Sequence, residues 1–184
     1  MKKIVVAITG GSCTLYAVAL LKTLKCLNIE THVIVSKIGF YNLAHECDVD
    51  VDEIKALSSY YYQNDDLAAS VASGSFKTDG MIVIPCSMHT LAAMASGMSH
   101  NLIHRAADVT LKEGRKLVIV PREMPFSAIH LENMLKLSRM GVVVMPASPG
   151  FYHQPETIED LVMIVVARVL DQVGIDAPLF KRWG

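Results

Sequence analysis

The stretch KKIVVAITGGSCTLYAVALLKTLKCL, residues 2–27, decides the fold of this chain. Residues 4–8 are apolar and mostly β-branched, which is typical of a strand that is covered on both faces. A glycine turn follows at residues 9–12, and from residue 14 to residue 27 the apolar side chains recur at helical spacing. This order of a buried strand, a tight turn and a helix predicts the first unit of a sheet with parallel strands.

Strands and helices continue to alternate along the rest of the chain. Further strands are predicted over residues 29–35, 81–84, 116–120 and 142–145, the last three closed by Pro85, Pro121 and Pro146. Helices are predicted over residues 14–27, 36–46, 50–57, 67–72, 90–96, 103–113, 127–139 and 155–173. We therefore expect one α/β domain over residues 1–184, with a doubly wound, mostly parallel sheet of Rossmann-like or flavodoxin-like type and helices on both faces.

The composition excludes several classes of protein. Hydrophobic residues make up 52% of the chain and charged residues 19%, which argues against disorder, and 184 residues can bury a full core. The formal net charge of −1 gives no polybasic face, so we expect neither nucleic acid nor an anionic membrane as a partner. Any affinity for phosphate must therefore come from a local site.

Cysteine spacing and apolar runs indicate a cytoplasmic protein. The four cysteines show neither a CxxC pair nor zinc-ligand spacing, which is typical of reduced thiols, and the N-terminal apolar run is too short for a signal peptide. Residues 81–103 lack acidic and basic side chains, but Pro85, Gly97 and several hydroxyls interrupt them, so we predict no membrane span. The histidines show no HExxH-type spacing, and we predict no metal site.

Candidate site residues lie just after the predicted strands, because ligands of open parallel sheets bind beyond the carboxyl ends of the strands. Gly10 and Gly11 could bring a phosphate to a helix N-terminus, or could simply form a tight connection. Ser12 and Ser36 could each contact a ligand or cap a helix. Glu46 lies near a predicted helix end, where a carboxylate is unfavourable, so it is either functional or a solvated surface residue.

The later loops contribute hydroxyls and cations. The loop after Pro85 offers several hydrogen-bond donors, from Ser87, Met88, His89 and Thr90. Arg122 and Glu123 lie between two prolines, where the arginine suits phosphate binding and the alternative is a structural ion pair. Arg168 lies in an apolar stretch, where we expect a buried anionic partner from the protein or from a ligand. With Lys112, these arginines predict a site that handles phosphate.

Several long stretches carry a resemblance to a known family. They are the glycine loop after IVVAIT (4–9), THVIVSK (31–37), ASGSFKTDGMIVIPCSMHTLA (72–92), RAADVTLKEGRKLVIVPREMP (105–125), HLENMLKLSRMG (130–141), PASPGFYHQPET (146–157) and VARVLDQ (166–172). Over essentially its full length the chain resembles the flavin prenyltransferases of the UbiX type, and in places the versions encoded beside hydroxyarylic-acid decarboxylases.

The resemblance implies a reaction and an assembly. Reduced FMN would be alkylated by dimethylallyl phosphate at N5 and then at C6, without a metal, to give the prenylated FMN that UbiD-type decarboxylases use. The resemblance also implies a homo-oligomer, a dodecamer with active sites at subunit junctions.

The resemblance also assigns roles to residues. The FMN-binding set would be Gly10, Gly11, Ser12, Ser36, Ser87, Met88, His89, Thr90 and Arg122. Dimethylallyl phosphate would be held by Lys112, Arg122, Tyr152 and Arg168. Lys112 and Glu123 would act on the phosphate, with Glu123 as the acid, and Ser12 and Glu46 would serve proton transfer near flavin N5.

One position departs from the family pattern, and two other functions stay open. The family has glycine after the serine of the first loop, where this chain has Cys13, which would be strained at a positive φ. A flavin-dependent cysteine decarboxylase shares this fold. A non-catalytic flavin carrier for a decarboxylase is the other alternative.

Overall fold

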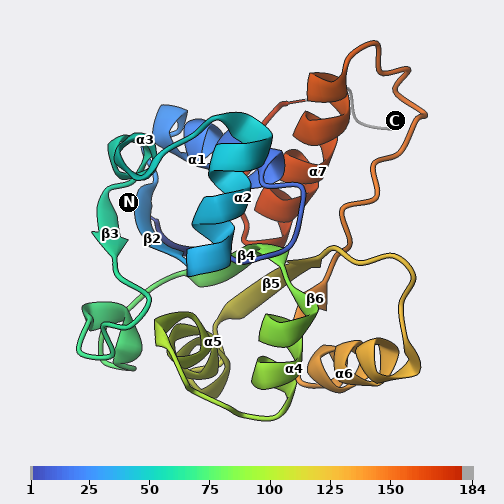
Figure 1. Cartoon of the computed structure of the whole chain (residues 1–184). Coiled ribbons are helices and arrows are strands. Elements are labelled where there is room, and N and C mark those ends of the chain that lie inside the picture. Colours follow the sequence, from blue (N-terminus) through green and yellow to red (C-terminus); the bar gives the residue numbers. More distant parts are fainter. Residues whose placement is uncertain (1, 180–184) are drawn as a thin grey trace.

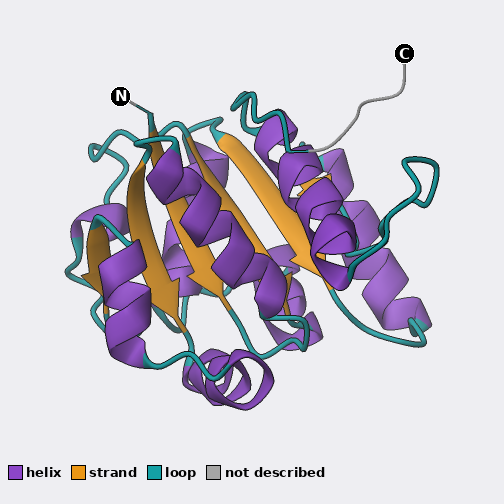
Figure 2. Cartoon of the chain, turned by 90° about the horizontal axis from the view of Figure 1, so that it is seen from above, coloured by secondary structure: helices purple, strands orange, loops and turns teal. Residues whose placement is uncertain are grey.

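A six-stranded sheet forms the centre of the fold, in the strand order β3-β2-β1-β4-β5-β6 (Figure 1). The computed structural model describes residues 2–179. The strands are β1 (Lys3–Ile8), β2 (Glu30–Val35), β3 (Tyr60–Tyr62), β4 (Gly80–Cys86), β5 (Lys116–Pro121) and β6 (Val143–Val144). Every pair of neighbouring strands in the described sheet is parallel, so the carboxyl ends share one edge (Figure 2). The predicted doubly wound fold is confirmed, and its winding reverses between β1 and β4.

Helices cover both faces of the sheet and create two apolar cores. They are α1 (Leu15–Cys26), α2 (Lys37–Cys47), α3 (Val51–Leu57), the 3-10 turn η1 (Ser70–Ala72), α4 (Met88–Ala95), α5 (Leu102–Lys112), α6 (Ala128–Arg139) and α7 (Ile158–Gln172). The first core joins one sheet face to α1, α2, α3 and α7. The second joins the other face to η1, α4, α5 and α6. Successive strand residues point to opposite faces, which is why the central strands are apolar throughout.

Several predicted elements differ from the observed ones, and β6 is shorter than predicted, at Val143–Val144 instead of 142–145. β4 does not end at Pro85 but pairs onward to Cys86, after a register irregularity against β5. α7 begins at Ile158 rather than at Pro155, because the side chain of Thr157 caps it and Asp160 completes a capping box. The helix predicted over residues 67–72 is reduced to η1.

The strand β3 was not predicted at all. Its three tyrosines offer neither an apolar run nor alternation. Backbone pairing with β2 forms the strand, and the Tyr62 hydroxyl is hydrogen-bonded to the buried ring of His32 at 2.9 Å. Tertiary contacts, rather than local pattern, therefore define this edge of the sheet.

Over the described residues, no helix has both the length and the apolar character that a membrane crossing requires. All four cysteines carry free thiols.

Candidate functional site

Thr9 joins the loop after β1, here called the first loop, to the end of β4, at the point where the winding of the sheet reverses. Its N–H and its hydroxyl both donate to the Pro85 carbonyl oxygen, at 3.2 and 2.8 Å. The hydroxyl oxygen in turn accepts the Ser87 N–H at 2.8 Å. The carboxyl ends of β1 and β4 are thus fixed to each other where doubly wound folds bind their ligands.

The glycines of the first loop allow close packing on both sides. A Cβ atom at Gly11 would lie 3.2 Å from Pro85, and one at Gly10 would lie 2.8 Å from a methyl group of Ile38 in α2. Asn42, also in α2, donates its side-chain N–H to the Gly11 carbonyl oxygen at 3.0 Å. The loop is therefore held between β4 and α2, with little room for larger residues.

Glu46 is exposed to solvent, yet its carboxylate contacts the same loop. From the last turn of α2, its Oε2 accepts the Thr14 N–H at 2.8 Å and the Thr14 hydroxyl at 2.9 Å. Partial burial by itself raises the pKa of Glu46, but hydrogen bonds from Ser12, Thr14 and Cys13 outweigh it and hold this pKa below its usual value. The N–H groups of Cys13 and Thr14 at the start of α1 are thus satisfied within the chain, so a phosphate there would have to displace a carboxylate.

The two other serines of the predicted flavin set are helix caps. The Ser36 hydroxyl accepts the Gly39 N–H at 3.0 Å at the start of α2, and the Ser87 hydroxyl accepts the Thr90 N–H at 3.3 Å at the start of α4. Ser87 also donates to the Thr90 hydroxyl at 3.1 Å. Met88 is half-buried and His89 is exposed in the first turn of α4. The start of α4 therefore presents two hydroxyls and helix N–H groups beside the first loop.

Arg122 and Glu123 follow β5 directly at this edge. The Arg122 N–H donates to the Cys86 carbonyl oxygen at 3.4 Å, which ties the segment after β5 to the end of β4. Glu123 is half-buried, and its Oε1 accepts the Met124 N–H at 3.0 Å. Within residues 2–179, no ion pair joins Arg122 to Glu123, so the structural ion pair considered from the sequence is absent there.

Tyr152 and Arg168 line one pocket of about 370 Å³ between the end of β6 and α7. The Met145 N–H donates to the Ile119 carbonyl oxygen at 2.9 Å, so this pocket begins at the same edge of the sheet as Arg122. The anionic partner expected for Arg168 is a protein carboxylate, that of Asp171 at 2.9 Å, but the pair is not fully buried, since the arginine side chain is 52% exposed and the aspartate side chain 18%. Helical geometry explains this, because residue 168 lies on the outer face of an otherwise buried helix.

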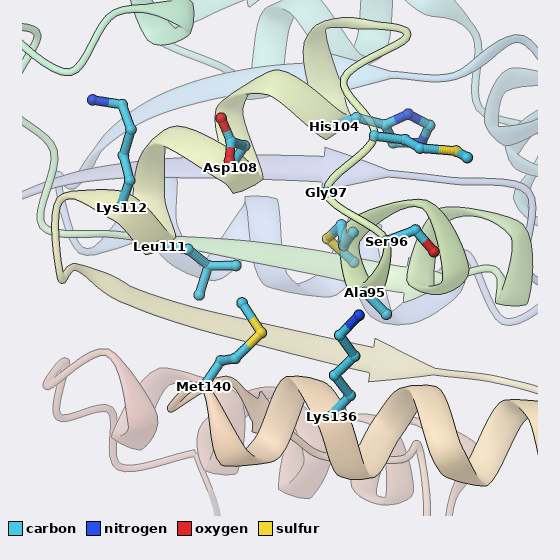
Figure 3. Close-up of a pocket in the computed structure, with 11 residues that line it drawn as sticks. Ala95, Ser96, Gly97, His104, Asp108, Leu111, Lys112, Lys136 and Met140 are labelled. Atoms are coloured by element: carbon cyan, nitrogen blue, oxygen red, sulfur yellow. The ribbon is translucent and has the colours of Figure 1, made fainter.

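Lys112 lies at the opposite edge of the sheet. It ends α5 just before β5 begins, and its Nζ contacts Glu113 and lies close to Gly74, which precedes β4. Figure 3 shows it beside the starts of the strands, at the end of a pocket between α4, α5 and α6. The prediction that Lys112 converges with Arg122 and Arg168 is therefore wrong within one chain.

Cys13 adopts a strained backbone conformation, with φ at +76°. This left-handed region costs an ordinary L-residue roughly 1–2 kcal/mol, because its Cβ approaches the following carbonyl oxygen. The backbone strain expected if Cys13 has a positive φ is therefore present in the first loop.

Replacing Cys13 by glycine should raise the free energy of unfolding by about 0.5–1 kcal/mol. Relief of the strain exceeds the additional freedom that glycine gives the unfolded chain, which is worth about 0.5–1 kcal/mol. Thermal melting should show a rise of about 1–4 °C. Cys13→Ala keeps the Cβ atom and the strain, so equal melting temperatures for the glycine and alanine variants would contradict this account.

The described residues contain no group of three histidine, cysteine, aspartate or glutamate side chains placed to hold a metal ion. Asn42 and Thr14 were missed by the sequence reasoning. Asn42 could have been found as a polar residue on the inward face of a helix, and Thr14 as a polar residue at the start of one.

Comparisons with known proteins place the whole chain among flavoproteins. Residues 1–170 match the Flavoprotein family. The chain is 53% identical to flavin prenyltransferase UbiX of Methanocaldococcus jannaschii over 182 residues, which cover 99% of this chain and 98% of that protein.

Two solved structures are similar over almost the whole chain. AnUbiX (PadA1), in complex with FMN and dimethylallyl pyrophosphate, has a TM-score of 0.98 at 46% identity and covers 100% of this chain and 97% of its own. The dodecameric FMN-dependent UbiX-like decarboxylase from Escherichia coli O157:H7 has a TM-score of 0.97 at 52% identity and covers 99% of both chains.

Proposed function

The chain belongs to the Flavoprotein family and, within it, to the UbiX-type flavin prenyltransferases, and we propose that its site transfers a dimethylallyl group from dimethylallyl phosphate to N5 and C6 of reduced FMN. The observation that carries the proposal is the pocket lined by Tyr152 and Arg168. It lies at the carboxyl edge of the sheet, where the loops with the predicted FMN-binding residues also lie. A phenol and a guanidinium suit a phosphate ester, since both donate hydrogen bonds to its oxygens.

The residues at the carboxyl edge fit FMN. Glu46 already occupies the start of α1, so the flavin phosphate is assigned to the start of α4, where the hydroxyls of Ser87 and Thr90 lie, with Ser36 and Arg122 nearby. Gly10 and Gly11 let the loop pack closely against Ile38 and Pro85 beside this place, and Ser12, Met88 and His89 complete the set. When bound, reduced FMN supplies the nucleophilic N5 and C6 atoms.

The cations of the chain take the place of a metal. Arg122, Arg168 and Lys112 stabilise the charge that develops on the departing phosphate, and Tyr152 orients it. Glu123, next to Arg122, protonates that phosphate. Ser12 and Glu46, which are hydrogen-bonded to each other, move a proton near flavin N5.

A homo-oligomer, a dodecamer, is part of the proposal. Lys112 can serve the phosphate only from a neighbouring copy, because it lies at the far edge of its own sheet. Apolar side chains on α6 support contacts between copies, since Ile129, Leu131 and Leu135 are all more than half exposed. The assembly of the E. coli relative supports the same number of subunits.

The product is proposed to serve a UbiD-type decarboxylase in the cytoplasm. Four free thiols support that compartment. A flavin carrier without activity and a cysteine decarboxylase are the two alternatives that the test below must separate.

The test is anaerobic incubation of the purified protein with reduced FMN and dimethylallyl phosphate, followed by mass spectrometry of the released flavin. We expect a gain of one dimethylallyl unit, with phosphate released, in the presence of a metal chelator. Unchanged FMN that stays tightly bound would support the carrier instead. Carbon dioxide from a peptide with a C-terminal cysteine would support the cysteine decarboxylase, and FAD as the bound flavin would contradict the assigned cofactor.

A further inference from the structure

Thr14 is a fully buried polar residue where the first loop enters α1. Its hydroxyl lies 2.9 Å from Oε2 of Glu46, 3.4 Å from the Asn42 carbonyl oxygen and 3.5 Å from the Cys47 sulfur. A hydroxyl has one proton to donate, and the closest acceptor is the carboxylate. The Cys47 thiol can donate to the hydroxyl oxygen in return, and the Asn42 carbonyl oxygen is the more distant alternative acceptor, so the shortest contact of the Thr14 hydroxyl is the one with Glu46.

The loop before Thr14 is shaped to complete this contact. The positive φ of Cys13 accompanies a turn in which the Ser12 hydroxyl and the N–H groups of Cys13 and Thr14 all meet the same carboxylate. Glu46 itself lies in the last turn of α2, where the helix dipole disfavours a negative charge. The hydrogen-bond donors at the start of α1 offset that cost. Thr14 supplies two of them, its N–H and its hydroxyl.

We propose that Thr14 is a positioning residue that holds the Glu46 carboxylate in hydrogen-bonding contact with Ser12. The inference rests on the proposed function, in which Ser12 and Glu46 move a proton. The backbone N–H of residue 14 is present whatever its side chain. The hydroxyl is therefore the part that this residue type adds, and it fixes an otherwise flexible glutamate side chain.

Other charged groups face Glu46 and must stay constant in any test. Lys22 of α1 and Glu159 of α7 line the same pocket of about 470 Å³ between α1, α2 and α7. His45 and Cys47 are its neighbours on α2, and Cys13 lies in the loop. None of these is altered by a substitution at residue 14, so a change in pH dependence would be due to the lost hydroxyl.

The first experiment measures thermal melting of the full chain from pH 7 to pH 3.5. Glu46 has a lowered pKa in the folded state, so its stabilising contribution is present above the unfolded pKa of about 4.3 and is lost as the pH falls through the folded pKa. Thr14→Val, which keeps the shape and removes the hydroxyl, should lower the melting temperature by about 3 °C at pH 7, and this loss should become smaller as the pH falls to 3.5.

Matched variants separate this role from packing. Thr14→Ser restores the hydroxyl and should restore most of the loss at pH 7, and Thr14→Ala serves as a second variant without it. In a Glu46→Ala background, the pH-dependent part of the Thr14→Val loss should disappear. A loss that is the same at both pH values and in both backgrounds would overturn the inference, because it would mark Thr14 as a packing residue.

The second experiment follows the pH dependence of FMN prenylation. Thr14→Val should move the acid limb of the rate upward by about half to one pH unit, and Thr14→Ser should return it. An unmoved acid limb would overturn the role in positioning. A wild-type protein that makes no prenylated flavin would instead contradict the proposed function, while the melting experiment would still decide whether Thr14 holds Glu46.

Discussion

Replacing Glu123 by glutamine should slow flavin prenylation by roughly a hundredfold or more, because a lost general acid typically costs this much. The expected loss lies in turnover, not in FMN affinity. Glutamine keeps a side-chain oxygen that can accept the Met124 N–H, which the Glu123 carboxylate accepts at 3.0 Å, so the loop after β5 should retain its shape. What the variant lacks is a proton to give to the departing phosphate.

The measurement pairs single-turnover rates with separate titrations of FMN and dimethylallyl phosphate. Glu132→Gln makes the same chemical change at an exposed position on α6 and should leave the rate unchanged. A Glu123→Gln protein that prenylates FMN at the parent rate would assign Glu123 to the structure of the loop alone.

Replacing Arg168 by alanine should weaken dimethylallyl phosphate binding about ten- to a hundredfold and leave FMN binding almost unchanged. A hydrogen bond to a charged group is worth about 1.5–3 kcal/mol, which gives this range. The ion pair between Arg168 and Asp171 is half-exposed and joins residues three positions apart along α7, so its loss should cost at most about 1 kcal/mol of stability.

Asp171→Asn is the control for that ion pair. It removes the charge that faces Arg168 and keeps the guanidinium, so prenyl phosphate affinity should stay within a few-fold of the parent. Each ligand is titrated separately by calorimetry, with a melting curve for every variant. An equal loss of both ligands in Arg168→Ala, or a loss of neither, would reject the assignment.

The sequence predicted the fold well because the buried parallel strands are nearly continuous apolar runs. β1, β2, β5 and their helices were found within a few residues of their observed ends. The prediction failed for structural features that depend on contacts with residues elsewhere in the chain. β3 exists through its pairing with β2 and the bond between Tyr62 and His32, and no local pattern marks it.

The candidate site was predicted in part. The carboxyl-end rule correctly grouped the loops that Thr9, Asn42 and the Arg122 N–H join. Lys112 was misplaced although the sequence held the signal: it comes four residues before the start of β5, and a residue just before a parallel strand lies at the amino edge. The apolar segment predicted an anionic partner for Arg168, which is Asp171, but it did not reveal that this pair lies on the solvent-facing side of α7.

The two border strands of the sheet limit how copies of this chain can join. β3 has three residues and β6 has two, so each offers few backbone N–H and C=O groups to an added strand. Sheets of separate molecules therefore cannot fuse into one continuous ladder at either border. Growth by strand addition, the usual origin of fibres from open sheets, is therefore disfavoured, which leaves helices and loops as the surfaces through which a closed assembly is built.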